Sequence, residues 1–549
     1  MADRAVHRAA ARLGVDRAAP RGARVPHRPA ALRQDADPAR DRALDPPRVR
    51  AAGSPGAAPA AAGEVAAPGG PTPPRALPRW RVFPALGLGT LMATLDLSVV
   101  NIALPTLSRA FGVPLTTVEW VVLAYVVTIT GLLLAFGRLS DLRGRRRVYG
   151  AGLVAFTAAS ALCAAAPDAG WLIAARAAQG LGAAMMMSNS AALLVASFGP
   201  EERGRALGAF GAMVGVGLAM GPPLGGLLVG SLSWRWIFLV NLPLGALAWW
   251  MVRRRVPADP PSRAGAAVDA AGAALWFAGL VALMLALSEG PTHGWAHPEV
   301  WPLFAAAAAL LAAFFAREAR RADPLLPVAL LRGPLGVAAL LTLLGQASSV
   351  AVGLHLPLYL EEVLGRGAAS AGRTLAVLPL VALVVAPLAG RWADRVGSRA
   401  LAAGGLLLAA GGYVALAGLG ADPHPARLYG GMALLGGGLG LFTVPNTSSL
   451  MSAVPRERLG IASGLQATMR NLGVAAGTAA TAAIVAVRYA AHGGGTLAAS
   501  GAQHALDRAA FAAATRDVYA AMAVVVALAA LAAWIGTPAR PPAAAAEAG

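Results

Sequence analysis

A short charged turn occurs twice in this chain, each time between long apolar runs. Residues 137–149 read G-R-L-S-D-L-R-G-R-R-R-V-Y, and residues 390–399 read G-R-W-A-D-R-V-G-S-R. The two turns share one spacing of Gly, Asp and Gly, formed by Gly137, Asp141 and Gly144 in the first and by Gly390, Asp394 and Gly397 in the second. The repetition predicts two related halves that each place this turn in the same water layer, as in membrane proteins built from internal repeats.

The composition indicates that lipid is the main solvent. Of the 549 residues, 57% are hydrophobic and only 13% are charged, with a mean hydropathy of +0.60, whereas a soluble protein carries charge on about a quarter of its residues. The net charge of +19 comes entirely from arginine, because the chain has no lysine. The arginines lie in short loops between apolar runs, which favours a role in topology over nucleic-acid binding.

The lack of lysine excludes two kinds of chemistry. A phosphate-binding P-loop and a Schiff base both need that residue, so ATP is not expected to be the energy source within this chain. The single cysteine, Cys163, lies in an apolar stretch and cannot form an intrachain disulfide.

The two ends of the chain differ from the rest. Residues 1–80 are rich in Arg, Ala and Pro and have no sustained apolar period, and the first hydrophobic run begins near Val82. We expect a disordered, dispensable tail, or a misplaced start codon, rather than a functional arm. Residues 538–549 are expected to form a short C-terminal tail.

About fourteen stretches after Val82 are long enough to cross a 30 Å hydrocarbon core as helices. Most of the arginines lie in alternate loops, which the positive-inside rule assigns to the cytoplasm together with both termini. The predicted spans are 82–105, 119–137, 148–166, 171–195, 206–229, 236–252, 268–288, 301–316, 335–359, 373–390, 401–419, 428–451, 460–487 and 518–535.

The distance between the repeated turns predicts an insertion. Gly137 and Gly390 are 253 positions apart. Six helices with their loops would take fewer residues, because a helix and its loop need about thirty residues. We therefore expect an N-terminal six-helix bundle over 81–254, two inserted helices with their loops over 255–333, and a C-terminal six-helix bundle over 334–537.

Five motifs occur in the order and spacing of a known family. They are Gly137–Arg146; Gly217, Gly221, Pro222, Gly225 and Gly226 in the fifth span; Asp96 with residues 99–105 in the first; Arg176 with Gly180 and Gly182 in the fourth; and Trp234–Phe238 with Asn241 and Pro243. This set resembles the major facilitator superfamily, specifically its fourteen-span drug:proton antiporter branch of the EmrB/QacA type, over nearly everything after residue 82.

The resemblance implies an all-α integral membrane protein of two six-helix bundles and two extra central helices. It implies export of small hydrophobic or cationic drug-like molecules by alternating access, with a proton as the coupling ion and with no metal, other cofactor, nucleic acid or ATP. A monomer in the bacterial cytoplasmic membrane is expected.

The repeated turns are candidate gating loops. Asp141 lies at an interface among arginines that include Arg138, Arg145 and Arg146, and a charge pair that breaks during rocking would hold one state shut. The alternative is that the arginines only fix the topology.

The helix-five glycines predict a bent, tightly packed helix, which the resemblance associates with a seal between the halves. An ordinary packing face is the alternative.

Asp96 and Arg176 are the candidate proton-coupling pair. Asp96 lies roughly 9 Å and Arg176 roughly 8 Å below the outer membrane edge by helix rise. If the first and fourth helices are neighbours, the carboxylate can exchange a proton while the arginine tunes its affinity; a static buried ion pair is the alternative.

Six polar residues inside predicted spans are candidates for a substrate cavity. A lipid-facing or packing role explains them about equally well, and His355 is expected to be a hydrogen-bonded structural imidazole. The six candidates are Gln179, Asn189, Gln346, Asn446, Gln466 and Arg470.

Other functions were weighed against drug efflux. A dedicated exporter of a secondary metabolite and a proton-coupled uptake symporter both fit the same spans. A membrane enzyme fits poorly, because the loops are short and basic and offer no acidic cluster as a catalytic site.

Overall fold

A computed structural model describes residues 79–198, 202–257, 268–295, 297–420, 423–493 and 507–538. Most of the predicted tails, 1–80 and 538–549, therefore lie outside the described residues. Within the described ranges all regular structure is helical, as expected where lipid offers the backbone no hydrogen-bond partner. The all-α membrane fold predicted from the sequence is confirmed.

The long helices follow the predicted spans and mostly extend past them. Thirteen helices of the described part are long and apolar enough to cross a membrane, and α5, with 29 residues, has the length of a fourteenth. The bounds are α1 (Phe83–Phe111), α2 (Leu115–Arg143), α3 (Arg145–Ala164), α4 (Ala169–Ser197), α5 (Arg203–Ser231), α6 (Trp236–Leu239), α7 (Asn241–Arg255), α8 (Ala270–His293), α9 (Val300–Glu318), α10 (Val328–Leu331), α11 (Pro334–Leu358), α12 (Ala368–Leu375), α13 (Val377–Val396), α14 (Ser398–Ala417), α15 (Pro425–Ser452), α16 (Leu459–Ala491) and α18 (Arg508–Gly536).

The repeated turns are helix ends rather than open loops. Gly137 to Arg143 form the last two turns of α2, and only Gly144 leaves the helix before α3 begins. Gly390 to Val396 likewise end α13, and Gly397 separates it from α14. Gly144 and Gly397 have φ of 94° and 91°, a backbone conformation that favours glycine. The predicted spans stopped too early because a helix continues beyond the apolar core into the charged interface.

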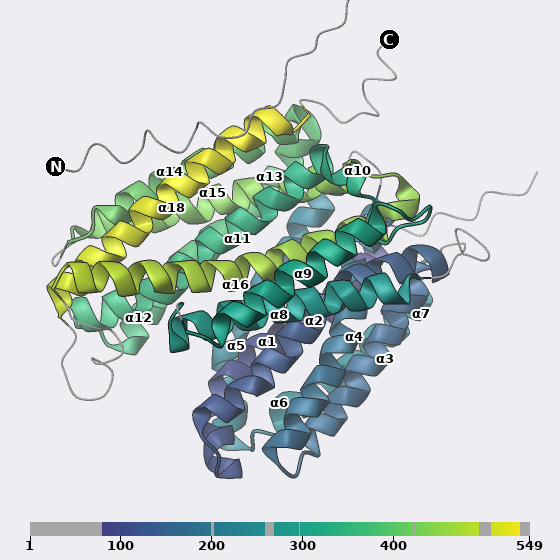
Figure 1. Cartoon of the computed structure of the whole chain (residues 1–549), viewed down its shortest axis with the longest axis horizontal. Helices are drawn as coiled ribbons and strands as arrows, with labels where there is room; N and C mark the ends of the chain where they lie inside the picture. Colours follow the sequence, from purple (N-terminus) through teal and green to yellow (C-terminus); the bar gives the residue numbers. More distant parts are fainter. Residues whose placement is uncertain are drawn as a thin grey trace, which may run out of the picture. The chain divides into compact units, whose positions relative to one another are not determined.

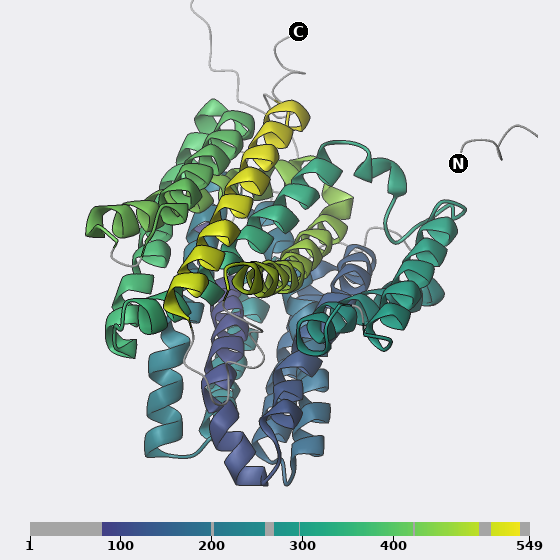
Figure 2. The ribbon, with the colours of Figure 1, turned by 60° about the vertical axis from the view of Figure 1, so that its left-hand side comes forward.

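The helices form two groups, one from the N-terminal half of the chain and one from the C-terminal half. In the first group α1 packs on α5 and α7, and α4 packs on α2 and α3; in the second α14 packs on α15 and α18, and α11 on α16. Figures 1 and 2 show the purple and blue helices gathered apart from the green and yellow ones. The inserted helices α8 and α9 pair with each other, and α8 lies against α2 and α16.

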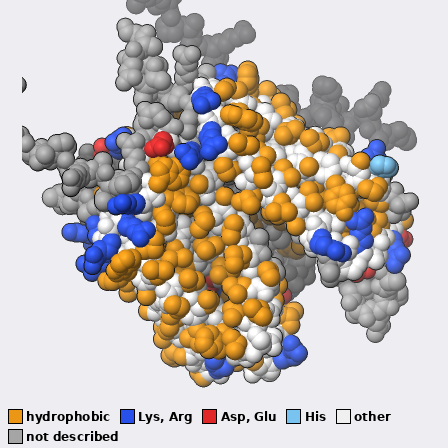
Figure 3. Space-filling view, turned by 180° about the vertical axis from the view of Figure 1, so that it is seen from behind, with side chains coloured by type: hydrophobic (Ala, Val, Ile, Leu, Met, Phe, Trp, Pro, Cys, Tyr) orange, Lys and Arg blue, Asp and Glu red, His pale blue; other side chains and the backbone are white. Residues whose placement is uncertain are grey.

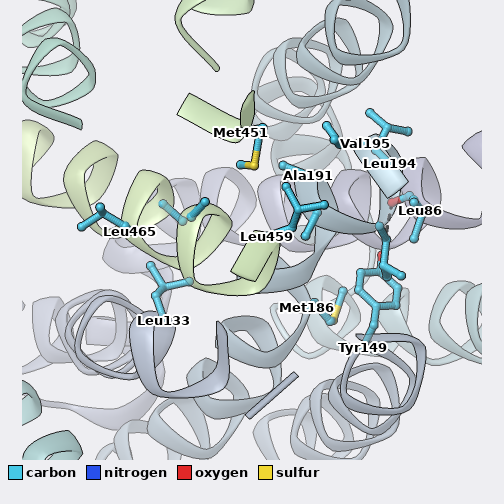
Figure 4. Close-up of a cluster of buried hydrophobic side chains, with 14 of the residues drawn as sticks. Leu86, Leu133, Tyr149, Met186, Ala191, Leu194, Val195, Met451, Leu459 and Leu465 are labelled. Atoms are coloured by element: carbon cyan, nitrogen blue, oxygen red, sulfur yellow. Dashed lines mark hydrogen bonds between the residues drawn. The ribbon is translucent and has the colours of Figure 1, made fainter. Parts of the chain in front are cut away.

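Three apolar clusters hold the helices together. One unites the arginine-rich ends of both groups, from Leu86 and Leu133 to Met451, Leu459 and Leu465 (Figure 4). The other two each belong to one group: one lies at the opposite ends of the first group's helices, and the other runs along the helices of the second group. The two groups therefore share a core only at their arginine-rich ends.

The outer surface is apolar as well. In Figure 3 hydrophobic side chains predominate over the described face, and arginines gather near its margins. Ile535 is 72% exposed and Trp250 47% exposed, which a lipid environment accommodates and water does not.

Candidate functional site

The carboxylate of Asp96 is the centre of the candidate site. Asp96 lies on α1, Arg176 and Gln179 lie one turn apart on α4, and Asn241 begins α7. Arg176 Nη1 is 2.6 Å from Asp96 Oδ2, while the amides of Gln179 and Asn241 each donate to Oδ1 at 2.9 Å. All four side chains are buried. The structure thus brings together the two residues that helix rise placed at one depth.

Arg176 is held by further groups of the first bundle. Its Nε donates to the carbonyl of Val121 at 3.0 Å, its Nη1 also donates to Gln179 Oε1 at 2.5 Å, and its guanidinium lies 4.0 Å from the ring centre of Tyr125. Its Nη2 has no hydrogen-bond partner in the described part of the chain. A buried pair of this kind costs about 3–5 kcal/mol when one partner is removed, because the other charge is left uncompensated.

Asn241 is a member of the site that sequence reasoning missed. A helix break places it there: Pro243 lacks the N–H that a continuous helix would donate to the carbonyl of Leu239, so α6 ends at Leu239 and α7 restarts at Asn241. The sequence signal was an amide two residues before a proline in an apolar run, and it entered the sequence analysis only as part of a family motif. Gln179, predicted for the substrate cavity, belongs instead to the Asp96 cluster and also donates to Ser160 at 2.8 Å.

Asp141 joins the two bundles at their arginine-rich ends. Its carboxylate accepts hydrogen bonds from the backbone N–H groups of Gly460 at 2.8 Å and Ile461 at 3.0 Å, in the first turn of α16, and from Arg145 at 3.0 Å. Arg145 also donates to the backbone carbonyl of Arg456, just before that helix. A carboxylate at a helix N-terminus is favoured by the exposed N–H groups and by the helix dipole.

Glycines let the two bundles approach closely, and they do so twice. A Cβ at Gly137 would collide with the carbonyl of Gly460, so α2 and α16 touch through their backbones. A Cβ at Gly390 would collide in the same way with the carbonyl of Gly204, where α13 meets α5. The repeated motif is therefore used twice at related contacts between the bundles. The side chain of Asp394 lies outside the described residues.

Two arginines of the first turn reach the segments around the inserted helices. Arg138 pairs with Asp323, which follows α9, and Arg146 donates to the carbonyl of Arg253 at the end of α7 at 2.7 Å. Asp323 is a partner that the sequence did not suggest, since it lies 185 positions away in a loop.

The helix-five glycines pack within the first bundle. Cβ atoms at Gly217 and Gly221 would collide with Thr94 and Ser98 of α1, and one at Gly225 would lie 3.2 Å from Val99. Gly226 faces open space, and the side chain of Pro222 lies outside the described residues. These contacts place the motif on the helix that carries Asp96, whereas α5 meets the second bundle through Gly204 and Gly208 at its other end.

The remaining cavity candidates fall into different surroundings. Asn189 is buried and donates to the carbonyl of Met185 on its own helix at 2.8 Å, and Asn446 of α15 donates to Thr342 of α11 at 2.9 Å. Gln466 donates to Thr447 at 2.5 Å. Gln346 packs against Gly473.

Two titratable side chains on span helices lack partners in the described part of the chain. Arg470 is half-buried on α16 and makes no hydrogen bond or ion pair there. His355 is buried on α11 and neither ring nitrogen has a partner, so the predicted hydrogen-bonded imidazole is wrong. Val352, one turn before it on the same face of α11, is apolar and offers no side-chain acceptor.

Two bundles of spanning helices, joined at one end by a repeated motif, have the architecture of membrane transporters built from internal repeats. The Major Facilitator Superfamily model matches residues 86–478, and the chain belongs to this superfamily. It is a membrane transporter, not an enzyme.

Comparison with individual proteins agrees with this family. The chain is 36% identical to the multidrug resistance protein Stp of Mycobacterium tuberculosis, over 73% of this chain and 75% of that protein. It is 31% identical to the riboflavin transporter RibZ of Clostridioides difficile, over 73% of this chain and 87% of that protein. The crystal structure of the human organic anion transporter MFSD10 (TETRAN) matches with a TM-score of 0.59 at 18% identity, over 83% of this chain and 99% of that chain, and shows the shared fold. The resemblance drawn from the motifs is confirmed.

Proposed function

We propose that this protein is a proton-driven exporter of small drug-like molecules, in the cytoplasmic membrane of a bacterium and with both termini in the cytoplasm. The name of the relative Stp supports a drug-like substrate. The arginine-rich helix ends support the orientation, because cytoplasmic loops carry the excess of positive charge. In this orientation the shared apolar core closes the cytoplasmic side.

The Asp96 cluster is the observation that carries the proposal. A carboxylate can couple proton movement to transport only if its proton affinity differs between the two states of the protein. Asp96 of α1 receives its donors from two other helices, α4 and α7, and so holds the three helices together. A shift of α1 against α4 would separate Asp96 from Arg176 and favour protonation, since an isolated buried carboxylate prefers its neutral form.

The glycine contacts of α5 supply a route for such a shift. Gly217, Gly221 and Gly225 let α5 lie directly on α1 beside Asp96, while Gly204 of the same helix touches Gly390 of the second bundle. Opening of the cytoplasmic contact would therefore pull on the helix that packs against the proton site. Helix α5 thus connects the contact between the bundles with the proposed proton site.

Two alternatives remain within transport. A dedicated exporter of one secondary metabolite has the same mechanism and a narrower substrate range. A proton-coupled uptake symporter is the second candidate. The name of the riboflavin transporter RibZ does not say in which direction that protein moves its substrate, so it is compatible with uptake. A cationic substrate is less well supported, because the donors around Asp96 already occupy both of its oxygens.

Reconstitution distinguishes these directions. The full chain is placed in liposomes with an imposed proton gradient, and accumulation of compounds that it confers resistance to in an efflux-deficient host is followed. Antiport predicts movement of drug against the proton flow. Movement of drug and protons in the same direction would replace the proposal with symport.

A further inference from the structure

Arg470 carries a positive charge near the middle of the membrane. It lies eleven positions after Leu459, the first residue of α16, which is about 17 Å along a helix that crosses a core of about 30 Å. A charged side chain at this depth is strongly unfavourable unless it finds a partner or water. Arg470 needs a compensating group that the fold has to provide or recruit.

The described part of the chain provides no such group. Its carboxylates pair with other residues: Asp96 binds Arg176 in the first bundle, and Asp517 binds Arg488 near the far end of α16. Asp141 is occupied at the gate by Arg145 and by the N-terminus of α16. No hydrogen bond is donated by the Arg470 guanidinium to a described residue, and the side chain is only half-buried, so it has access to space.

The surroundings of Arg470 include polar side chains of both bundles. Gln466, one turn before it, donates to Thr447 of α15, and Gly473, one turn after it, packs against Gln346 of α11. The adjacent Asn471 donates to Thr130 of α2 at 3.1 Å and marks the contact with the first bundle. Val474, one turn after Arg470, is 43% exposed. Arg470 therefore lies beside the contact between the bundles, on a part of α16 that the other helices do not fully cover.

We infer that Arg470 is a substrate-binding residue and that the transported molecules carry an acidic group, a carboxylate in the simplest case. A planar guanidinium binds a carboxylate through two parallel hydrogen bonds. Gln466 lies one turn before Arg470, and Gln346 of α11 packs against Gly473 one turn after it, so polar residues flank the guanidinium along α16. The inference rests on the proposed transport function and specifies its substrate class. It replaces the cationic substrates expected from the resemblance with organic acids.

The test uses pairs of compounds that differ only in the acidic group. Benzylpenicillin, fusidic acid and rhodamine B are each compared with their alkyl esters, and binding to the purified full chain is measured by the shift in thermal unfolding and by equilibrium titration. Arg470→Gln removes the charge, and Arg470→Lys keeps it without the planar fork. Arg516→Gln is the control, because Arg516 lies on α18 with a side chain that is 53% exposed.

The expected result is that at least one acid binds the parent chain more tightly than its ester by about tenfold or more, the size of one charge-assisted contact. Arg470→Gln should abolish that difference, Arg470→Lys should retain part of it, and Arg516→Gln should leave it unchanged. Without ligand, Arg470→Gln should unfold at the same or a higher temperature than the parent, because it removes an uncompensated charge. The inference is overturned if acids and esters bind alike, if no acid of the set binds, or if Arg470→Gln keeps the preference.

Proton transport is measured on the same samples to separate this inference from the proposed function. Acid binding that depends on Arg470, without any proton movement, would leave the binding site standing and reject antiport. Proton-driven export that is equal for acids and esters and unaffected by Arg470→Gln would leave antiport standing and reject the binding site.

Discussion

Asp141 accepts a hydrogen bond at 2.8 Å from the backbone N–H of Gly460, a residue 319 positions further along the chain and in the other bundle. The contact joins the end of α2 to the start of α16, and the close approach of Gly137 to Gly460 makes it possible. A side chain of one bundle thus caps a helix of the other, so the cap is lost whenever the bundles separate at this end.

Asp141→Asn should slow the conformational cycle and leave substrate affinity largely intact. The asparagine can still accept one hydrogen bond, but it loses the charge interactions with the helix dipole and with Arg145. Together these are worth about 1 kcal/mol, or roughly fivefold in the equilibrium between joined and separated bundles at this end. Turnover and binding are measured separately in liposomes, for this variant and for Asp394→Asn at the repeated position. Unchanged turnover in both variants would remove the gating role of the motif.

The pair of Arg138 and Asp323 predicts that the inserted helices influence the gate. Asp323→Asn removes the ion pair that joins the charged turn to the segment after α9. Because the Asp323 side chain is 40% exposed, the effect should be at most about 1 kcal/mol. Turnover should change by less than in Asp141→Asn, and the change should shrink at high salt. Glu457→Gln, an exposed carboxylate near the same surface, is the control; an equal effect in both variants would make the pair irrelevant to gating.

The orientation of the spans can be tested with reporter fusions. An enzyme that is active only outside the cytoplasm should be active when fused near His293, at the end of α8, and silent near Arg255, at the end of α7. The prediction follows from the arginines that gather at one end of the helices. The reverse pattern would invert the topology and the direction of the proposed export.

Asp269 anchors α8 to the end of α9 and should do so at every physiological pH. Hydrogen bonds from Arg317, at 2.7 and 2.9 Å, lower the pKa of Asp269 from its ordinary value to about 2. A lowered pKa in the folded state means that the stabilisation is complete above about pH 4 and is lost as the pH falls toward 2. Asp269→Asn should therefore lower the thermal midpoint at pH 7, with a gap to the parent that narrows between pH 4 and 2. A gap that is constant with pH would contradict an ionised Asp269.

Sequence reasoning located the helices because lipid imposes long apolar runs, and helix rise alone placed Asp96 and Arg176 at one depth. It did not find the partners that arise from tertiary contacts. Asn241 enters the site through a helix break, Asp323 reaches Arg138 from a distant loop, and Gly460 meets Asp141 through its backbone, which carries no side-chain signal at all. Residue types and periods predict elements, whereas such pairs depend on how the elements are packed together.

The buried ion pair of Asp96 with Arg176 should also affect the stability of the fold. Asp96→Asn leaves Arg176 with a buried charge and no counter-ion, which should lower stability by about 3 kcal/mol, while the double variant Asp96→Asn with Arg176→Gln removes both charges and should recover part of that loss. Arg176→Ala strands the carboxylate instead, and should shift the pH optimum of transport or inactivate it. Recovery in the double variant separates loss of coupling from loss of the fold.

The most direct test of the account is proton release on drug binding, followed with a pH dye in the purified full chain across about pH 5 to 9. The parent chain should release protons when drug is added. Asp96→Asn and the double variant should bind drug without releasing protons and should fail to pump against a gradient. If Asp96→Asn still releases protons and pumps like the parent, the coupling group lies elsewhere and the ion pair of Asp96 with Arg176 is only structural.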